Sequence, residues 1–294
     1  MLTNKEEILK SYNPNEPIWV IGPSIHSLKF KDLICQNLQN KNVITIGHCL
    51  HEILSNWDFV PNFFTWLDPH QTHRLFGQEQ LFLNLNKKIN FIVPECITSN
   101  KKNMNSSAFG DPKKNKVWKA YHRFLEFCHS SEKINFHRMP TIMFHSKNPK
   151  FHSQYPKEVA QIKSNPEYRF NCKYAVLGEP KFTVQNILTF SILPTLHYLN
   201  FKTIFVLGFD GNWERFYPHA VLTGKTPTNP KYRAGGWPKY INPAHRKMHT
   251  IQKWMDWQPY HKLKIYNLQD ESPLNGKIPF MTFQESLEYN ADIC

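Results

Sequence analysis

Short apolar runs separated by longer amphipathic segments set the pattern of this chain. The runs are rich in β-branched and aromatic residues and predict strands at 18–21, 42–46, 62–67, 89–93, 173–177, 203–207 and 262–268. Several runs are apolar at every position, which is typical of strands covered by helices on both faces. The pattern therefore predicts an α/β fold with a doubly wound, mostly parallel, Rossmann-like sheet.

Helices are expected between these runs, at 24–39, 48–56, 70–84, 115–130, 183–199 and 243–257. The segment 183–199 is almost entirely apolar, so we expect it to be buried and kinked near Phe190 by Pro194. Two stretches, 97–116 and 211–242, are too long to be simple connections. Because the second combines glycine and proline with many aromatic residues, we interpret it as a lid that orders over a ligand. We expect a single domain over 1–294 that carries this lid.

Composition and charge narrow the class of protein. Of the 294 residues, 40% are hydrophobic, which argues against global disorder. The net charge of +13 is spread along the sequence without a zinc-finger or RNP pattern, so nucleic acid is not the expected partner. The six cysteines have no CxxC spacing, which favours reduced thiols. The sequence has neither a membrane-span-length apolar run nor a signal peptide, so we expect a cytoplasmic protein. Its positive charge could also attract it to the surface of an anionic inner membrane.

Polar residues and glycines follow four of the expected strands. Because the carboxyl ends of parallel strands meet at one edge of a sheet, ligands bind there, and a glycine lets another group approach the main chain. We therefore expect a nucleotide-binding site formed by Gly22, Pro23, Ser24, Gly47, His48, Asp68, Gly208, Asp210, Asn212 and Trp213. Asp68 and Asp210 could instead cap a helix and a turn.

Histidine pairs are a second candidate for chemistry. His245 and His249 are four residues apart and would share one helix face, where they could hold a metal. The chain has 15 histidines and no HExxH motif, so chance pairs are expected and we predict no metal site. A single histidine acting as a general base is less demanding, because imidazole titrates near neutrality.

Four segments resemble known glycosyltransferases. The turn IGPSIHSL resembles the GNGPSL turn of bacterial lipooligosaccharide sialyltransferases and the GPSL turn of flagellin-modifying nonulosonate transferases. FVPNFFTWLDPHQ resembles the Asp-Pro strand of the second group, and FKTIFVLGFDGNW resembles the shared segment GYKEIYLSGIDFY. AHRKMHTIQKWMDWQPYHKLKIYNL follows the pattern in which a catalytic histidine opens a helix ahead of a strand KLYCL. The resemblance covers roughly 17–75 and 180–275, with departures at Ile21, Asp68 and Asn212.

The resemblance implies a sialyltransferase-type fold and an inverting glycosyltransferase that needs neither a metal nor a cofactor. It would transfer a sialic acid-like sugar from a CMP-activated donor to a glycan or lipooligosaccharide acceptor, and it could form a homo-oligomer. His245 falls on the family's catalytic histidine, Tyr217 would supply a tyrosine facing the donor phosphate, and Thr183 would contact the nucleotide sugar.

Two other classes of function stay open. One is an enzyme resembling an archaeal pterin pyrophosphokinase, which shares the GPSL turn and the Asp-Pro strand. Such an enzyme would use ATP and hold magnesium with Asp68 and Asp210. The other is a non-enzymatic module that binds anionic glycan or nucleic acid through its basic residues. The pyrophosphokinase-like enzyme would depend on magnesium, whereas the transferase would not. The binding module would keep its activity after a change of His245, whereas the transferase would lose activity.

Overall fold

A computed structural model describes most of the chain in two compact units. The described residues are 5–65, 75–94, 116–143, 155–165, 168, 171–177, 188, 192–209, 263–270, 272, 275 and 278–289. One unit comprises Met1–Pro14 and Thr65–Phe201, and the other comprises Asn15–Phe64 and Lys202–Cys294. The predicted lid at 211–242 and the predicted helix at 243–257 lie outside the described residues.

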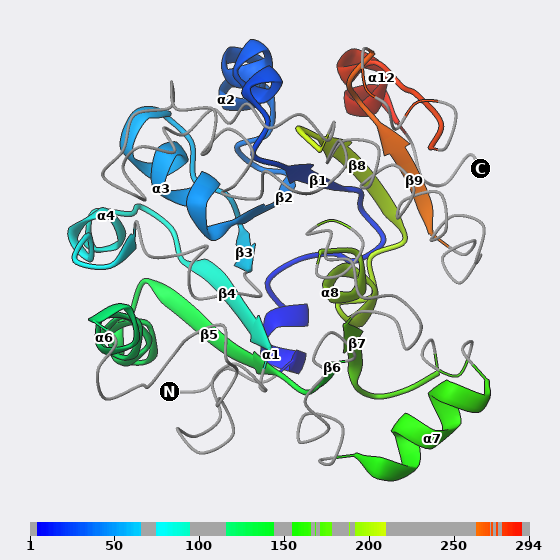
Figure 1. The fold of residues 1–294 in the computed structure, drawn as a ribbon. Helices are drawn as coiled ribbons and strands as arrows, with labels where there is room; N and C mark the ends of the chain where they lie inside the picture. Colours follow the sequence, from blue (N-terminus) through cyan, green and yellow to red (C-terminus); the bar gives the residue numbers. More distant parts are fainter. Residues whose placement is uncertain are drawn as a thin grey trace, which may run out of the picture. The chain divides into compact units, whose positions relative to one another are not determined.

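The central element is a seven-stranded sheet with the order β5-β4-β3-β2-β1-β8-β9 (Figure 1). Its strands are β1 (Ile18–Ile21), β2 (Asn42–Ile46), β3 (Phe63–Thr65), β4 (Ile89–Pro94), β5 (Ile134–Met139), β8 (Thr203–Leu207) and β9 (Lys264–Asn267). The pairs β1–β2, β1–β8, β4–β5 and β8–β9 are all parallel. The prediction of an α/β fold with a mostly parallel sheet is confirmed.

Continuous burial explains why the strand predictions succeed in the second unit. Every residue of β1, β2 and β8 is buried. Each fully buried Val, Ile, Leu or Phe side chain contributes about 1.5–3 kcal/mol relative to its exposed state. A strand with both faces buried therefore reads as an uninterrupted apolar run, as these strands do.

The described helices of the second unit are η1 (Ile25–Phe30), α2 (Lys31–Asn37), α3 (Gly47–Asn56) and α12 (Phe283–Glu288). The prediction of a single helix over 24–39 is wrong, because the chain forms the 3₁₀ segment η1 before α2 begins. Phe30, at the junction, has φ −102° and ψ 2°, outside the α-helical region.

Helix α12, which the sequence pattern did not predict, is held by a hydrogen bond of 3.1 Å from Trp19 Nε1 to Ser286 Oγ.

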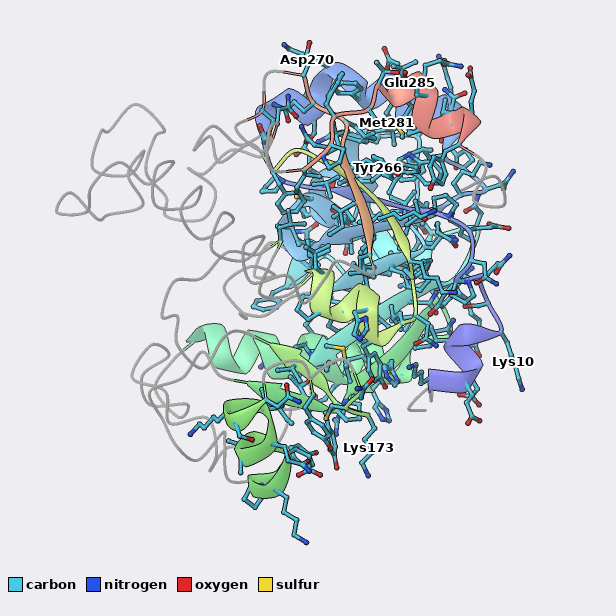
Figure 2. All side chains as sticks on the ribbon, turned by 90° about the vertical axis from the view of Figure 1, so that its right-hand side faces the viewer. Lys10, Lys173, Tyr266, Asp270, Met281 and Glu285 are labelled. Carbon is cyan, nitrogen blue, oxygen red and sulfur yellow. The ribbon has the colours of Figure 1, made fainter. Side chains whose placement is uncertain are left out.

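The chain beyond β9 returns to the end of this strand and forms a parallel bridge between Asn267 and Phe280. Figure 2 shows Asp270, Met281 and Glu285 gathered beyond one end of β9, on which Tyr266 lies. Asn267 at the end of β9 donates its N–H to Pro279 O at 2.9 Å, and its carbonyl accepts from Met281 N at 3.0 Å. These backbone bonds fix the segment that leads into α12.

The first unit contains a second, two-stranded sheet of β6 (Thr141–Met143) and β7 (Ala175–Leu177). The strand predicted at 173–177 lies here and not in the central sheet, and β5, which was not predicted, forms the edge of that sheet. A small core of Ile142, Val159, Ile162 and Val176 joins β6 and β7 to helix α7, Pro156–Ser164. The local sheet thus buries its own apolar side chains.

The other described helices of the first unit are α1 (Lys5–Leu9), α4 (Gln80–Leu83), α6 (Lys116–Ser130) and α8 (Leu193–Tyr198). Pro194 lies in the first turn of α8, where its missing N–H costs no helical hydrogen bond. The kink expected near Phe190 falls on residues that the structure does not describe. In the part of the chain that is described, no helix has the length and apolar character to span a bilayer.

Candidate functional site

The strand order reverses direction at β1. From β1 the sheet extends through β2 and β3 to β5 on one side, whereas β8 and β9 lie on the other side of β1 (Figure 1). The register pairs Ile21 of β1 with Leu207 of β8, so the carboxyl ends of the two strands are level. In open α/β sheets, ligands bind beyond the carboxyl ends at such a reversal. The turns that follow β1 and β8 are therefore the candidate site.

Four hydrogen bonds fix the turn after β1. Gly22 N donates to Leu207 O at 2.7 Å, and Ser24 N donates to Gly208 O at 3.1 Å. Ser27 Oγ in η1 donates to Gly22 O at 3.2 Å, and Thr45 Oγ1 in β2 donates to Ile21 O at 2.9 Å. Because β8, β2 and η1 each supply a partner, the turn is held from three sides.

Gly22 and Gly208 lie so close together that neither position has room for a side chain. Gly208 has φ +78°, and a Cβ there would meet Ser27 Oγ and lie 2.7 Å from Gly22 O. A Cβ on Gly22 would lie 2.5 Å from Gly208 O and would also meet the ring of Phe209. The group that approaches the main chain at Gly22 is therefore the turn after β8 of the same chain.

The backbone donors of the β1 turn are already engaged. Many glycine turns bind phosphate through free backbone N–H groups. Here the N–H groups of Gly22 and Ser24 bond to β8 and its turn, and Pro23 has no N–H. Gly22–Ser24 therefore offers an anion no backbone donor. The residue beside it, Phe209, is half-buried and can contact an uncharged group.

Of the remaining predicted residues, Gly47 and His48 lie in a described helix, and the others lie outside the described residues. Gly47 is buried and is the first residue of α3, and His48 follows it in the helix. The helix begins directly after β2, the strand that pairs with β1. The side chain of His48 is not among those described. The predicted residues outside the described part of the chain are Asp68, Thr183, Asp210, Asn212, Trp213, Tyr217 and His245. Among the side chains that are described, no three His, Cys, Asp or Glu groups are placed to hold a metal.

Three contributors to the site were missed by sequence reasoning: Ser27, Thr45 and Phe209. Ser27 and Thr45 are fully buried hydroxyl residues whose bonds stabilise the β1 turn. A hydroxyl inside an apolar strand such as NVITI was a usable signal for Thr45, because a buried polar group needs a partner. Phe209 carries no such signal, since its contact with Gly22 joins segments far apart in the chain. Ser27 bonds to Gly22 O only five residues away, but it lies among other polar residues and does not stand out.

A second polar cluster lies in the first unit. His137 Nε2 of β5 is 3.1 Å from the hydroxyl oxygen of Tyr198 in α8, and Lys5 Nζ is 4.4 Å from the centre of the Tyr198 ring. Burial raises the pKa of Tyr198 to about 12 and lowers the pKa of Lys5. The hydroxyl of Tyr12 donates to Leu199 O at 2.8 Å. These contacts attach the N-terminal segment to α8.

Comparison with known proteins finds no matching family model, no matching curated protein and no matching solved structure. The likeness to sialyltransferases stays a prediction from the four segments quoted above. Two of them, IGPSIHSL and FKTIFVLGFDGNW, contribute the turns at β1 and β8.

Proposed function

We propose that this protein is a metal-independent, inverting glycosyltransferase with a doubly wound, sialyltransferase-type fold. The donor is a CMP-activated, sialic acid-like sugar, and the acceptor is a glycan. One observation supports the proposal above others. Gly22 and Gly208, from two of the segments that resemble sialyltransferases, lie in bonded turns where the strand order reverses. This is the edge of an α/β sheet at which nucleotides bind.

The reaction requires two kinds of group in the site: a hydrogen-bond donor for the departing phosphate and a base for the acceptor hydroxyl. The bond between the sugar's anomeric carbon and the phosphate oxygen of CMP breaks through a transition state with cationic sugar character, and a bond to the acceptor oxygen forms. The departing phosphate must be stabilised by hydrogen-bond donors, a role that we assign to the hydroxyl of Tyr217. The acceptor hydroxyl must lose its proton, and we assign its removal to His245.

The nucleotide part of the donor is assigned to the two turns and their neighbours. In the proposal, Gly22, Pro23, Ser24 and Gly208 border the nucleoside, and Asp68 accepts hydrogen bonds from ribose hydroxyls. The remaining contacts are assigned to Gly47, His48, Thr183, Asp210, Asn212 and Trp213. The absence of free N–H donors in Gly22–Ser24 supports placing a neutral part of the donor beside them.

Replacement of His245 tests the assigned reaction. A general base contributes about 10²- to 10⁴-fold in rate, so His245→Ala is expected to reduce transfer from a CMP-sugar by that factor. CMP affinity is expected to stay nearly unchanged, because the base acts on the acceptor. The measurement is single-turnover transfer together with CMP titration calorimetry, with His249→Ala as the matched control.

Two outcomes contradict the proposal. Near-normal transfer by His245→Ala would remove the histidine from the mechanism and make His219 the next candidate. Activity that requires magnesium and ATP, and that is abolished by a chelator, would favour a pyrophosphokinase.

A further inference from the structure

We propose that the ring of Phe209 is the surface on which the base of the nucleotide stacks, so that the base end of the donor, and not the phosphate, lies against the β1 turn. The inference rests on the proposed function and specifies how its donor is oriented. It follows from the hydrogen-bonding state of the turn and from the position of one aromatic side chain.

Among the groups that the structure describes, the backbone of Gly22–Ser24 offers a phosphate no N–H donor. The N–H groups of Gly22 and Ser24 donate to Leu207 O and Gly208 O, and Pro23 has none. The hydroxyl of Ser27 is committed to Gly22 O. A phosphate placed here would lose water without gaining these donors in exchange, which is costly for a charged group. An uncharged, flat group pays no such penalty.

Phe209 lies against this turn and has the aromatic ring on which such a group would stack. Its Cδ2 and Cε2 atoms contact the space above Gly22, which a side chain at position 22 would fill. The ring follows Gly208, whose left-handed backbone is itself fixed against the β1 turn. Phe209 is half-buried, so part of its surface stays accessible. A ring that is already held in place loses little conformational freedom when a base stacks on it.

The size of the effect follows from base stacking on aromatic side chains. Removal of such a ring typically weakens binding by a factor of about 5 to 150 per base, and the loss is shared by every ligand that carries the base. A phosphate contact would behave differently, because its loss would affect CMP and spare cytidine.

The test compares cytidine, CMP and ribose 5-phosphate by titration calorimetry on the full chain. Phe209→Leu keeps an apolar side chain against Gly22 and removes the ring. It is expected to lower the affinities for cytidine and for CMP by the same factor, about 5- to 150-fold. Phe209→Tyr restores the ring and is expected to bind as the wild type does. Phe280→Leu, at an exposed phenylalanine of the same unit, is the matched control and is expected to change neither affinity.

The outcomes separate this inference from the function on which it rests. If wild type binds CMP and Phe209→Leu binds it equally well, the stacking assignment is wrong and the proposed function survives. Loss of CMP binding with cytidine unaffected would put the phosphate at Phe209 and overturn the orientation. Failure of the wild type to bind any nucleotide overturns both proposals. On the wild type alone, ribose 5-phosphate that binds as tightly as CMP would overturn the inference even if Phe209→Leu failed to fold.

Discussion

Gly208 and Gly77 have the same left-handed backbone, with φ +78° at both, and differ in what surrounds them. A Cβ at Gly77 would meet nothing within 4 Å, whereas a Cβ at Gly208 would meet Ser27 Oγ and the backbone of Gly22. The conformational cost of an alanine is therefore common to both positions. The steric cost is specific to Gly208, where the two turns of the candidate site meet.

We predict that Gly208→Ala is clearly more destabilising than Gly77→Ala. Overpacking in a tightly packed region costs about 1–3 kcal/mol, and this should be the difference between the two losses in the free energy of unfolding. Urea unfolding of both variants, followed by tryptophan fluorescence and circular dichroism, measures it. Equal losses would mean that the turns move apart at little cost, and that Gly208 does not fix the site.

The short helix α12 is stabilised without a long apolar pattern. Thr282 Oγ1 accepts from Glu285 N at 3.2 Å, and the Glu285 carboxylate accepts from Thr282 N at 2.7 Å and from the Thr282 hydroxyl. This capping box satisfies backbone donors at the start of the helix. The two bonds from Thr282 lower the pKa of Glu285, because they stabilise its charged form.

The capping box predicts a pH dependence with a definite sign. A carboxyl group whose pKa is lower in the folded protein contributes stability above its ordinary pKa, and this contribution is lost as the pH falls through the folded value. Glu285→Gln is therefore expected to unfold more easily than wild type at pH 7, with the difference shrinking as the pH is lowered below the ordinary value of 4.5. Urea midpoints between pH 7 and pH 3 measure this. A difference that stays constant over that range would contradict the role assigned to the charge.

Strands were predictable where both faces are buried and less so elsewhere. The bounds predicted for β1, β2 and β8 agree with the structure, since their apolar runs are continuous. Strand β5, INFHRM, is only partly buried and carries a histidine and an arginine, so its pattern did not stand out. The break between η1 and α2 depends on the backbone at Phe30, which no periodicity reveals.

For the whole molecule, the edge of the candidate site could be predicted and its internal contacts could not. Glycines directly after two buried strands indicated where the site would lie. Which atoms fill the space beside Gly22 depends on β8 lying next to β1, a pairing between distant parts of the chain. For this reason the sequence suggested an approaching ligand at Gly22, whereas the structure has Phe209 and Gly208 O there.

We propose that a nucleotide binds at the turns after β1 and β8, a claim that hydrogen–deuterium exchange with and without CMP can test. A bound ligand suppresses local opening of the backbone that it contacts, so exchange slows at the site. We predict slower exchange with CMP in peptides covering 22–30 and 203–209, and unchanged exchange in a peptide covering 134–143. Protection that appears elsewhere, with both turns exchanging as in the free protein, would contradict the claim.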